Sequence, residues 1–166
     1  MSNVGAVVNT AVALGANVVS NSCGGSESCT GAAYSHPGVA ITASTGDSGN
    51  VAARSPASYP SVIVVAGTSL TRISPRAETA WSGAGSYCST AFAATLEQVS
   101  YGRTQVQACG SRRGATGIFS DAGPNNAVAV YGSFTDRGQT GWLVFALHGL
   151  GGWVAHAGRP LVAGKH

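Results

Sequence analysis

Two residue types that take part in acyl-transfer chemistry, a carboxyl and a hydroxyl, stand together in Gly46-Asp47-Ser48-Gly49. The motif follows a run of apolar residues, so we expect it at the carboxyl end of a β-strand. Glycines on both sides let a substrate backbone approach the Asp47 carboxyl, which when protonated can donate a hydrogen bond to a developing oxyanion. The alternative is a structural role, in which Asp47 caps a turn or the following helix.

Ser48 in the same motif invites comparison with chymotrypsin-like proteases, in which a serine of this tetrapeptide is the nucleophile. That chemistry requires a histidine base and a buried aspartate, held in an all-β fold. Here the motif ends a strand of the parallel type, and the only histidine before it is His36. The context therefore disfavours Ser48 as a nucleophile.

The elements that must position this motif follow from the apolar pattern. Helical spacing over residues 3–14, followed by Gly15, predicts a helix with a glycine C-terminal cap. Three β-branched runs, residues 16–20, 37–44 and 61–66, are typical of buried parallel strands. We therefore expect an α/β domain with a mostly parallel sheet flanked by helices, and functional groups at the carboxyl ends of its strands.

The pattern is looser from residue 71 to residue 124, where the segment is polar and only residues 92–99 favour a helix. Two further strands are predicted at residues 127–131 and 142–147. A turn at residues 135–138 is expected to join them.

Length, composition and charge limit the classes to which the protein can belong. The chain has 166 residues, enough for one domain, with 24 glycines and only 9% charged residues against an average of roughly 25%. The net charge is +3 and only Arg112-Arg113 cluster, so we expect no nucleic-acid partner. The most apolar run, of about 14 residues from Trp142, is too short to span a membrane, and no signal peptide is recognised at Met1.

The four cysteines are Cys23, Cys29, Cys88 and Cys109, and their spacing is unlike that of a zinc site. Disulfides Cys23–Cys29 and Cys88–Cys109 would each close a short loop in an exported protein. Four cysteines allow three connectivities, so the sequence leaves the pairing open.

Several blocks of sequence together resemble the sedolisins, the serine-carboxyl peptidases, over residues 3–145. The blocks are Val18–Ser22, Ser35–Gly49, Pro56–Ile63, Glu78–Ser86, Ser120–Pro124 and Val128–Tyr131. The resemblance implies a subtilisin-like fold and a secreted, acid-acting endopeptidase or tripeptidyl-peptidase with peptide or protein substrates. It also implies that Asp47 is the oxyanion-hole aspartate.

The chain departs from the family pattern at three places. The Glu and Asp that act as base and supporting acid lie upstream in the family, whereas the first acidic residue here is Glu27. The family nucleophile follows the strand resembling residues 141–144, but no serine follows Ser133. The family calcium site also lies beyond the matching region, so we expect no cofactor, and residues 146–166 form a tail without family similarity that a shifted reading frame would explain.

These departures define the functional expectation. Residues 1–145 are expected to be an incomplete sedolisin-type peptidase domain that does not hydrolyse peptides, because it lacks the nucleophile and the carboxyl pair. The alternative is a non-catalytic remnant that binds peptides or has no independent role. A nucleotide-binding domain is disfavoured, since the Gly-x-Gly-x-x-Gly and Walker motifs are absent. An incomplete sheet is also expected to expose apolar edges and to aggregate.

Overall fold

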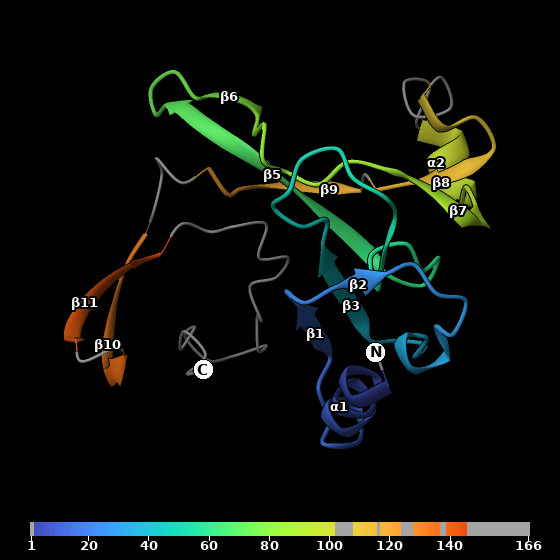
Figure 1. The fold of residues 1–166 in the computed structure, drawn as a ribbon, viewed down its shortest axis with the longest axis horizontal. Coiled ribbons are helices and arrows are strands. Elements are labelled where there is room, and N and C mark those ends of the chain that lie inside the picture. The colour runs from blue at the N-terminus through green and yellow to red at the C-terminus, as the bar shows by residue number, and fades with distance from the viewer. Residues whose placement is uncertain (1, 102–107, 116, 124–127, 137–138, 146–166) are drawn as a thin grey trace.

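The computed structural model describes residues 2–101, 108–115, 117–123, 128–136 and 139–145. Its central element is a five-stranded, mainly parallel sheet (Figure 1). Three parallel pairings link four of the strands in the order β1-β3-β5-β9, and β6 pairs antiparallel with the far end of β5. These strands are β1 (Val18–Asn21), β3 (Ala40–Ser44), β5 (Ile63–Arg72), β9 (Ile118–Asp121) and β6 (Ala77–Ala80).

Helix α1 (Ser2–Ala13) precedes the sheet and ends as the apolar pattern predicts. Gly15 has a φ of 89°, and its N–H bonds to the Val12 carbonyl while the N–H of Ala16 bonds to the Ala11 carbonyl. This pair of bonds is a Schellman motif, which satisfies carbonyls that the helix end leaves free. Val8 on the inner face of α1 is 1% exposed. The helix is therefore anchored to the core just before β1 begins.

The hydrophobic core lies where α1, the sheet and the connections between strands meet. Side chains from these three sources are almost fully buried, among them Val8, Tyr34, Ile41, Ala43, Tyr59, Val62 and Val64. The rings of Tyr34 and Tyr59 are 5.3 Å apart, and Phe92 meets Tyr59 edge to face at 5.8 Å. Aromatic packing thus joins segments that are far apart in the sequence.

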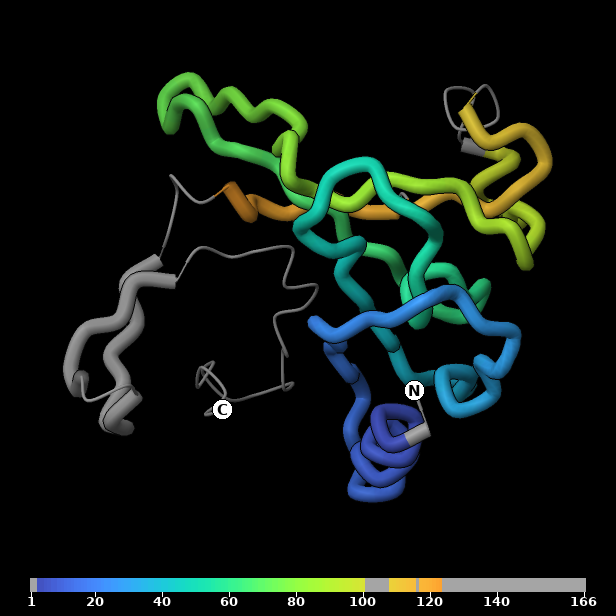
Figure 2. The backbone as a smooth tube through the Cα atoms, viewed as in Figure 1, coloured from blue at the N-terminus to red at the C-terminus, as the bar shows by residue number. Residues whose placement is uncertain are grey.

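The remaining elements form small ribbons and short helices outside the main sheet. They are β2 (Gly25–Ser26) with β4 (Arg54–Ser55), β7 (Cys88–Ala93) with β8 (Arg112–Gly114), β10 (Val128–Asp136) with β11 (Gln139–Phe145), the 3-10 helix η1 (Ala32–Tyr34) and helix α2 (Leu96–Tyr101). In Figure 2 the β7–β8 ribbon and α2 lie towards one end of β9, and the turn between β5 and β6 lies towards its other end.

The α/β class and the mainly parallel sheet agree with the sequence prediction, as do the first helix and the first three strands. The expected flanking helices are fewer. Among the described residues the α-helical segments are α1, the six-residue α2 and residues 108–109, because the long connections contain ribbons instead. The predicted strands 127–131 and 142–147 correspond to β10 and β11, although residues 146–147 and the whole 146–166 tail lie outside the described residues.

The helix expected over residues 92–99 is wrong in its first half. Residues 92 and 93 belong to β7, whose backbone pairs with β8. The helix begins only after Thr95, whose hydroxyl accepts the backbone N–H of Gln98 as an N-terminal cap. A long-range pairing and a local capping signal together shift the element towards the C-terminus.

Candidate functional site

The carboxyl ends of β1 and β3 lie side by side and carry the polar residues that the sequence singled out. The strands pair in parallel with Asn21 opposite Ala43, and the Asn21 side-chain amide donates to the Thr42 carbonyl at 3.0 Å. Beyond these ends lies a hollow of about 110 Å³, called here the first hollow. It is lined by Ser22, Gly24, Ser44, Thr45, Gly46, Asp47, Arg54, Ser55 and Ala57.

Asp47 is exposed on the loop that follows β3. The loop turns at two glycines with positive φ, Gly46 at 97° and Gly49 at 66°, a backbone conformation that side chains disfavour. The only described side-chain contact of the carboxyl is a hydroxyl bond from Ser48 at 3.4 Å. The carboxyl is therefore accessible to a molecule that enters the first hollow, as an oxyanion donor must be.

A second chain segment holds this loop in place. The N–H of Gly85 bonds to the Gly46 carbonyl at 2.9 Å, and the N–H of Gly49 bonds to the Gly83 carbonyl at 2.9 Å. A Cβ atom on Gly85 would overlap the Thr45 carbonyl, so the two backbones meet at a distance that only glycine permits. This segment belongs to the block Glu78–Ser86 that resembles the sedolisins, but nothing in the sequence predicted that it supports the Asp47 loop.

Trp81 opens the supporting segment and packs over glycines. Its N–H bonds to the Gly67 carbonyl at 3.1 Å, and a Cβ atom on Gly83 would overlap its indole ring. A Cβ on Gly67 would also come within 2.9 Å of the ring. Trp81 therefore packs at the junction between β5 and the loop-supporting segment.

Thr45 also lines the first hollow. It is 1% exposed, and its hydroxyl has no hydrogen-bond partner among the described residues. Its backbone N–H is bound to the Val65 carbonyl at 3.0 Å, which fixes the residue at the end of β3. An unsatisfied buried hydroxyl costs free energy, so a ligand atom or water that reached it would be stabilised.

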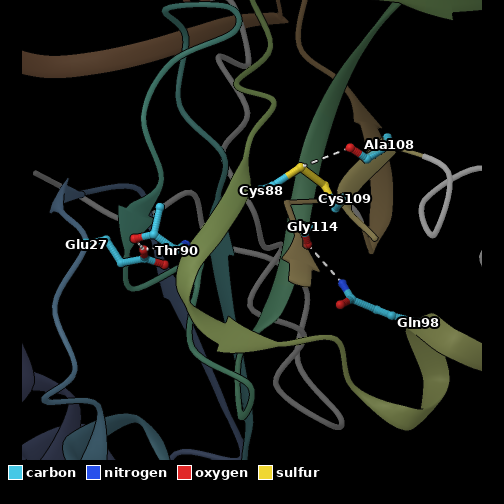
Figure 3. Close-up of a disulfide and its surroundings, with 7 residues drawn as sticks. All are labelled: Glu27, Cys88, Thr90, Gln98, Ala108, Cys109 and Gly114. Carbon is cyan, nitrogen blue, oxygen red and sulfur yellow. Dashed lines mark hydrogen bonds between the residues drawn. A yellow bond between two sulfur atoms is a disulfide. The ribbon is translucent and has the colours of Figure 1, made fainter. Parts of the chain in front are cut away.

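A larger second hollow of about 490 Å³ lies beside the first. It is lined by Gly25, Ser26, Glu27, Val51, Ala52, Ala53, Arg54 and Thr90. Glu27 comes from the end of β2 and Thr90 from β7, and Figure 3 shows the two side chains in contact. The second hollow therefore forms where the β2–β4 ribbon meets β7.

The Glu27 carboxylate accepts four hydrogen bonds. Oε1 accepts the Ser89 hydroxyl at 2.5 Å, and Oε2 accepts the Thr90 hydroxyl at 2.6 Å and the backbone N–H groups of Thr90 and Ala91 at 2.8 and 3.2 Å. Burial raises the pKa of Glu27, but these bonds outweigh burial, so the pKa is lowered from 4.5. A carboxylate this well occupied and this acidic is a poor general base.

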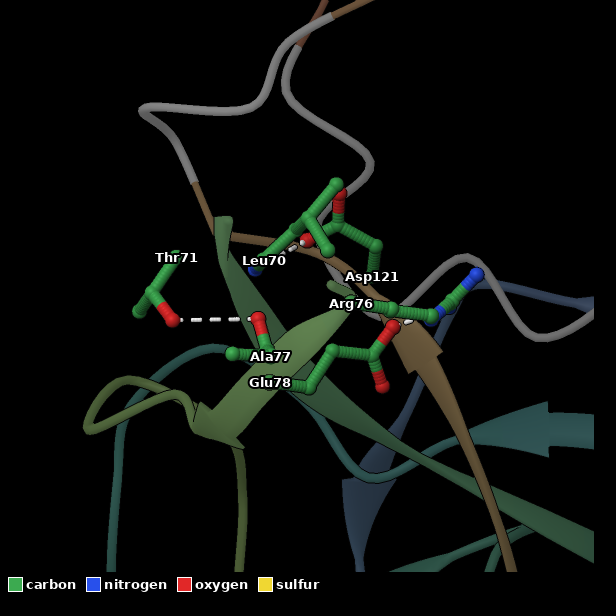
Figure 4. A network of polar contacts seen from close by, with 6 residues as sticks. All are labelled: Leu70, Thr71, Arg76, Ala77, Glu78 and Asp121. Atoms are coloured by element: carbon green, nitrogen blue, oxygen red, sulfur yellow. Dashed lines mark hydrogen bonds and ion pairs between the residues drawn. The ribbon is translucent and has the colours of Figure 1, made fainter. Parts of the chain in front are cut away.

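His36 and two further acidic residues, Asp121 and Glu78, lie elsewhere. His36 Nε2 is 2.9 Å from Asn9 Oδ1 on α1, so the only histidine before Ser48 is engaged away from it. Asp121 Oδ1 accepts the Leu70 backbone N–H at 3.2 Å, and Glu78 pairs with Arg76, as Figure 4 shows. None of these three residues lines either hollow.

The cysteines pair in one of the two expected places. Cys88 and Cys109 form a disulfide that joins β7 to the segment before β8, with Cα atoms 5.4 Å apart (Figure 3). Cys23 and Cys29 are free and exposed, so the suggested Cys23–Cys29 disulfide is wrong. Between them, Gly25 and Ser26 form the short strand β2, which pairs with β4.

In the described residues, no group of three or more His, Cys, Asp or Glu side chains is placed to hold a metal ion. No helix in the same part of the chain is long and apolar enough to cross a membrane.

The structure thus defines an α/β domain with an exposed carboxyl at the carboxyl ends of parallel strands. No protein-family model matches the chain, and no curated protein matches it. Assignment to a particular family therefore rests on the sequence motifs and is treated as a proposal.

Proposed function

We propose that this chain is a subtilisin-like domain related to the sedolisins, and that it binds peptides in the first hollow without hydrolysing them. The observation that carries the proposal is the exposed Asp47 carboxyl, set between Gly46 and Gly49 beyond β3. Ligands of open parallel sheets gather at this end of the strands. The order of the parallel strands and the motifs at their ends support the relationship.

The binding chemistry follows from the groups that line the first hollow. At acidic pH a protonated Asp47 donates a hydrogen bond to a peptide carbonyl, the interaction that would strengthen if an oxyanion developed there.

Hydrolysis requires more than an oxyanion donor. A nucleophile and a base must lie within hydrogen-bond reach of each other. Ser48 has no histidine beside it among the described residues, and the Glu27 lone pairs are occupied. A domain with the donor alone keeps at most a small residual activity. The alternative function is a peptidase-like remnant with no independent role.

The proposed location is extracellular, as in the sedolisins. The Cys88–Cys109 disulfide supports this location, because such bonds persist in oxidising compartments. The proposed partners are peptides or proteins, with no nucleic acid and no membrane.

The test is equilibrium binding of fluorescent peptides between pH 3 and pH 7, with mass spectrometry of the same mixtures to detect cleavage. We expect binding that strengthens as pH falls, without cleavage. Asp47→Ala should lose most of the binding. Asp47→Asn should bind with little pH dependence, because an amide donates at every pH.

Glu78→Gln is the matched control, since it removes one carboxylate outside both hollows. It should bind as the wild-type chain does. Cleavage abolished by Asp47→Ala would replace the proposal with an active peptidase. No binding by a folded wild-type chain would favour the remnant without an independent role.

A further inference from the structure

Arg54 is the one residue that lines both hollows. It begins β4 and pairs with Ser26 of β2. Its carbonyl accepts the Ser58 N–H at 2.9 Å and the Tyr87 hydroxyl at 3.4 Å. Because these contacts are made by its backbone, the position of Arg54 does not depend on its side chain.

Arg54 is the only basic residue in the lining of either hollow, and it has no salt bridge among the described residues. Burial raises the pKa of Tyr87 to about 12 despite the opposing positive charge of Arg54. Tyr87 is therefore neutral over the working pH range and does not compensate the guanidinium.

Each hollow is lined by one acidic residue as well as by Arg54, but the roles of the two acidic residues differ. Glu27 in the second hollow is satisfied by four hydrogen bonds from Ser89, Thr90 and Ala91. Asp47 in the first hollow is the group that the proposed function assigns to a peptide carbonyl. Neither carboxylate forms a salt bridge with the guanidinium, so its donors remain available to a ligand.

We propose that the second hollow is a subsite for a carboxylate of the bound peptide, which Arg54 recognises at the junction of the two hollows. The inference rests on the proposed function, since the peptide backbone occupies the first hollow. A volume of about 490 Å³ accommodates a glutamate side chain, and Val51 and Ala52 provide apolar wall for its methylenes. Arginine binds carboxylates through paired, charge-assisted hydrogen bonds.

The test uses short peptides capped at both ends, in which Glu, Gln or Lys occupies each position in turn, and a second set with a free C-terminal carboxylate. Binding is measured from pH 4 to pH 6.5, a range that begins where acidic pH favours the proposed Asp47 contact and ends where glutamate is mostly ionised. At one position Glu should bind about tenfold more tightly than Gln. If the C-terminal carboxylate is the ligand, the preference will instead appear only in uncapped peptides.

Variants of Arg54 distinguish a specific contact from general charge attraction. Arg54→Gln should remove the Glu preference and leave Gln peptides bound, Arg54→Lys should keep part of it, and Arg54→Glu should favour Lys peptides. Arg76→Gln is the matched control, because it removes the same charge outside both hollows. Circular dichroism confirms that each variant is folded.

Three results would overturn this inference. One is a wild-type chain that binds Glu and Gln peptides equally, which leaves the proposed function intact. Another is a preference that survives in folded Arg54→Gln or disappears equally in Arg76→Gln. The third is a wild-type chain that binds no peptide, which overturns the proposed function as well.

Discussion

Glu27 Oε2 accepts both the backbone N–H of Thr90, at 2.8 Å, and its hydroxyl, at 2.6 Å. The two residues are 63 positions apart, so this pair fastens the β2 segment to β7 across the second hollow. The Ser89 hydroxyl, which binds Oε1, also accepts the N–H of Phe92 at 2.8 Å. One carboxylate therefore organises the start of β7 as well as the wall of the hollow.

Glu27→Gln should destabilise the fold by on the order of 1 kcal/mol, because the amide nitrogen faces donors that the carboxylate accepts. Urea denaturation at pH 7 measures the change. Glu78→Gln, which alters an exposed surface pair, should change stability much less. Equal losses in the two variants would contradict a specific role for the Glu27 network.

The same carboxylate predicts a pH dependence of stability. The pKa of Glu27 in the folded chain lies below 4.5, so its contribution is fully present above pH 4.5 and is lost as pH falls through the folded value. The wild-type chain should therefore lose stability more steeply below pH 4.5 than Glu27→Gln. Parallel denaturation curves for the two chains from pH 6 to pH 3 would refute this.

Reducing the Cys88–Cys109 disulfide should lower the free energy of unfolding by about 2–4 kcal/mol, since the bond closes a loop of 21 positions. Cys88→Ser should show the same loss, whereas Cys23→Ser should be nearly neutral. Thiol titration of the native chain should find two reactive groups, Cys23 and Cys29. Detection of no free thiol would contradict the pairing.

Gly85→Ala should displace the Asp47 loop, because the added methyl would overlap the Thr45 carbonyl. We expect a stability loss of about 1–3 kcal/mol and weaker peptide binding. Ala84→Gly, one position earlier, adds no atoms and serves as the control. Unchanged peptide binding by Gly85→Ala would show that the loop does not depend on this contact.

Among the described strands β9 pairs only with β5, and its side chains Ile118 and Phe119 are 52% and 59% exposed. Unprotected edges with apolar side chains promote association between chains. Phe119→Lys should therefore lower light scattering during concentration, without lowering the unfolding midpoint. A Phe119→Leu variant, which stays apolar, should scatter as the wild-type chain does.

The local features were predictable because their signals are short-range. The Gly15 cap and the three apolar runs of β1, β3 and β5 depend on residues within a few positions of one another. The positive φ at Gly46 and Gly49 also agrees with the expectation that Asp47 stands on a glycine turn. Its place at the end of a parallel strand followed from the same apolar run.

The ribbons and the second hollow were not predictable in the same way. Strands β6 to β9 lie in the polar segment, where alternation is weak and pairing partners are far away in sequence. In the sequence Glu27 is an isolated acidic residue in a loop, and only the fold places Ser89 and Thr90 beside it. The sequence pattern likewise does not single out Arg54 as a binding residue, because the two hollows that it lines are formed by segments that meet only in the fold.

The packing of Trp81 over Gly67 and Gly83 also makes this residue an optical reporter. Its indole packs against Gly83. The Gly83 carbonyl accepts the N–H of Gly49, which is two residues after Asp47. Emission from this ring therefore registers a rearrangement of the loop without any attached dye. In a chain whose other tryptophans, Trp142 and Trp153, are changed to phenylalanine, ligand entry becomes visible as a shift in fluorescence.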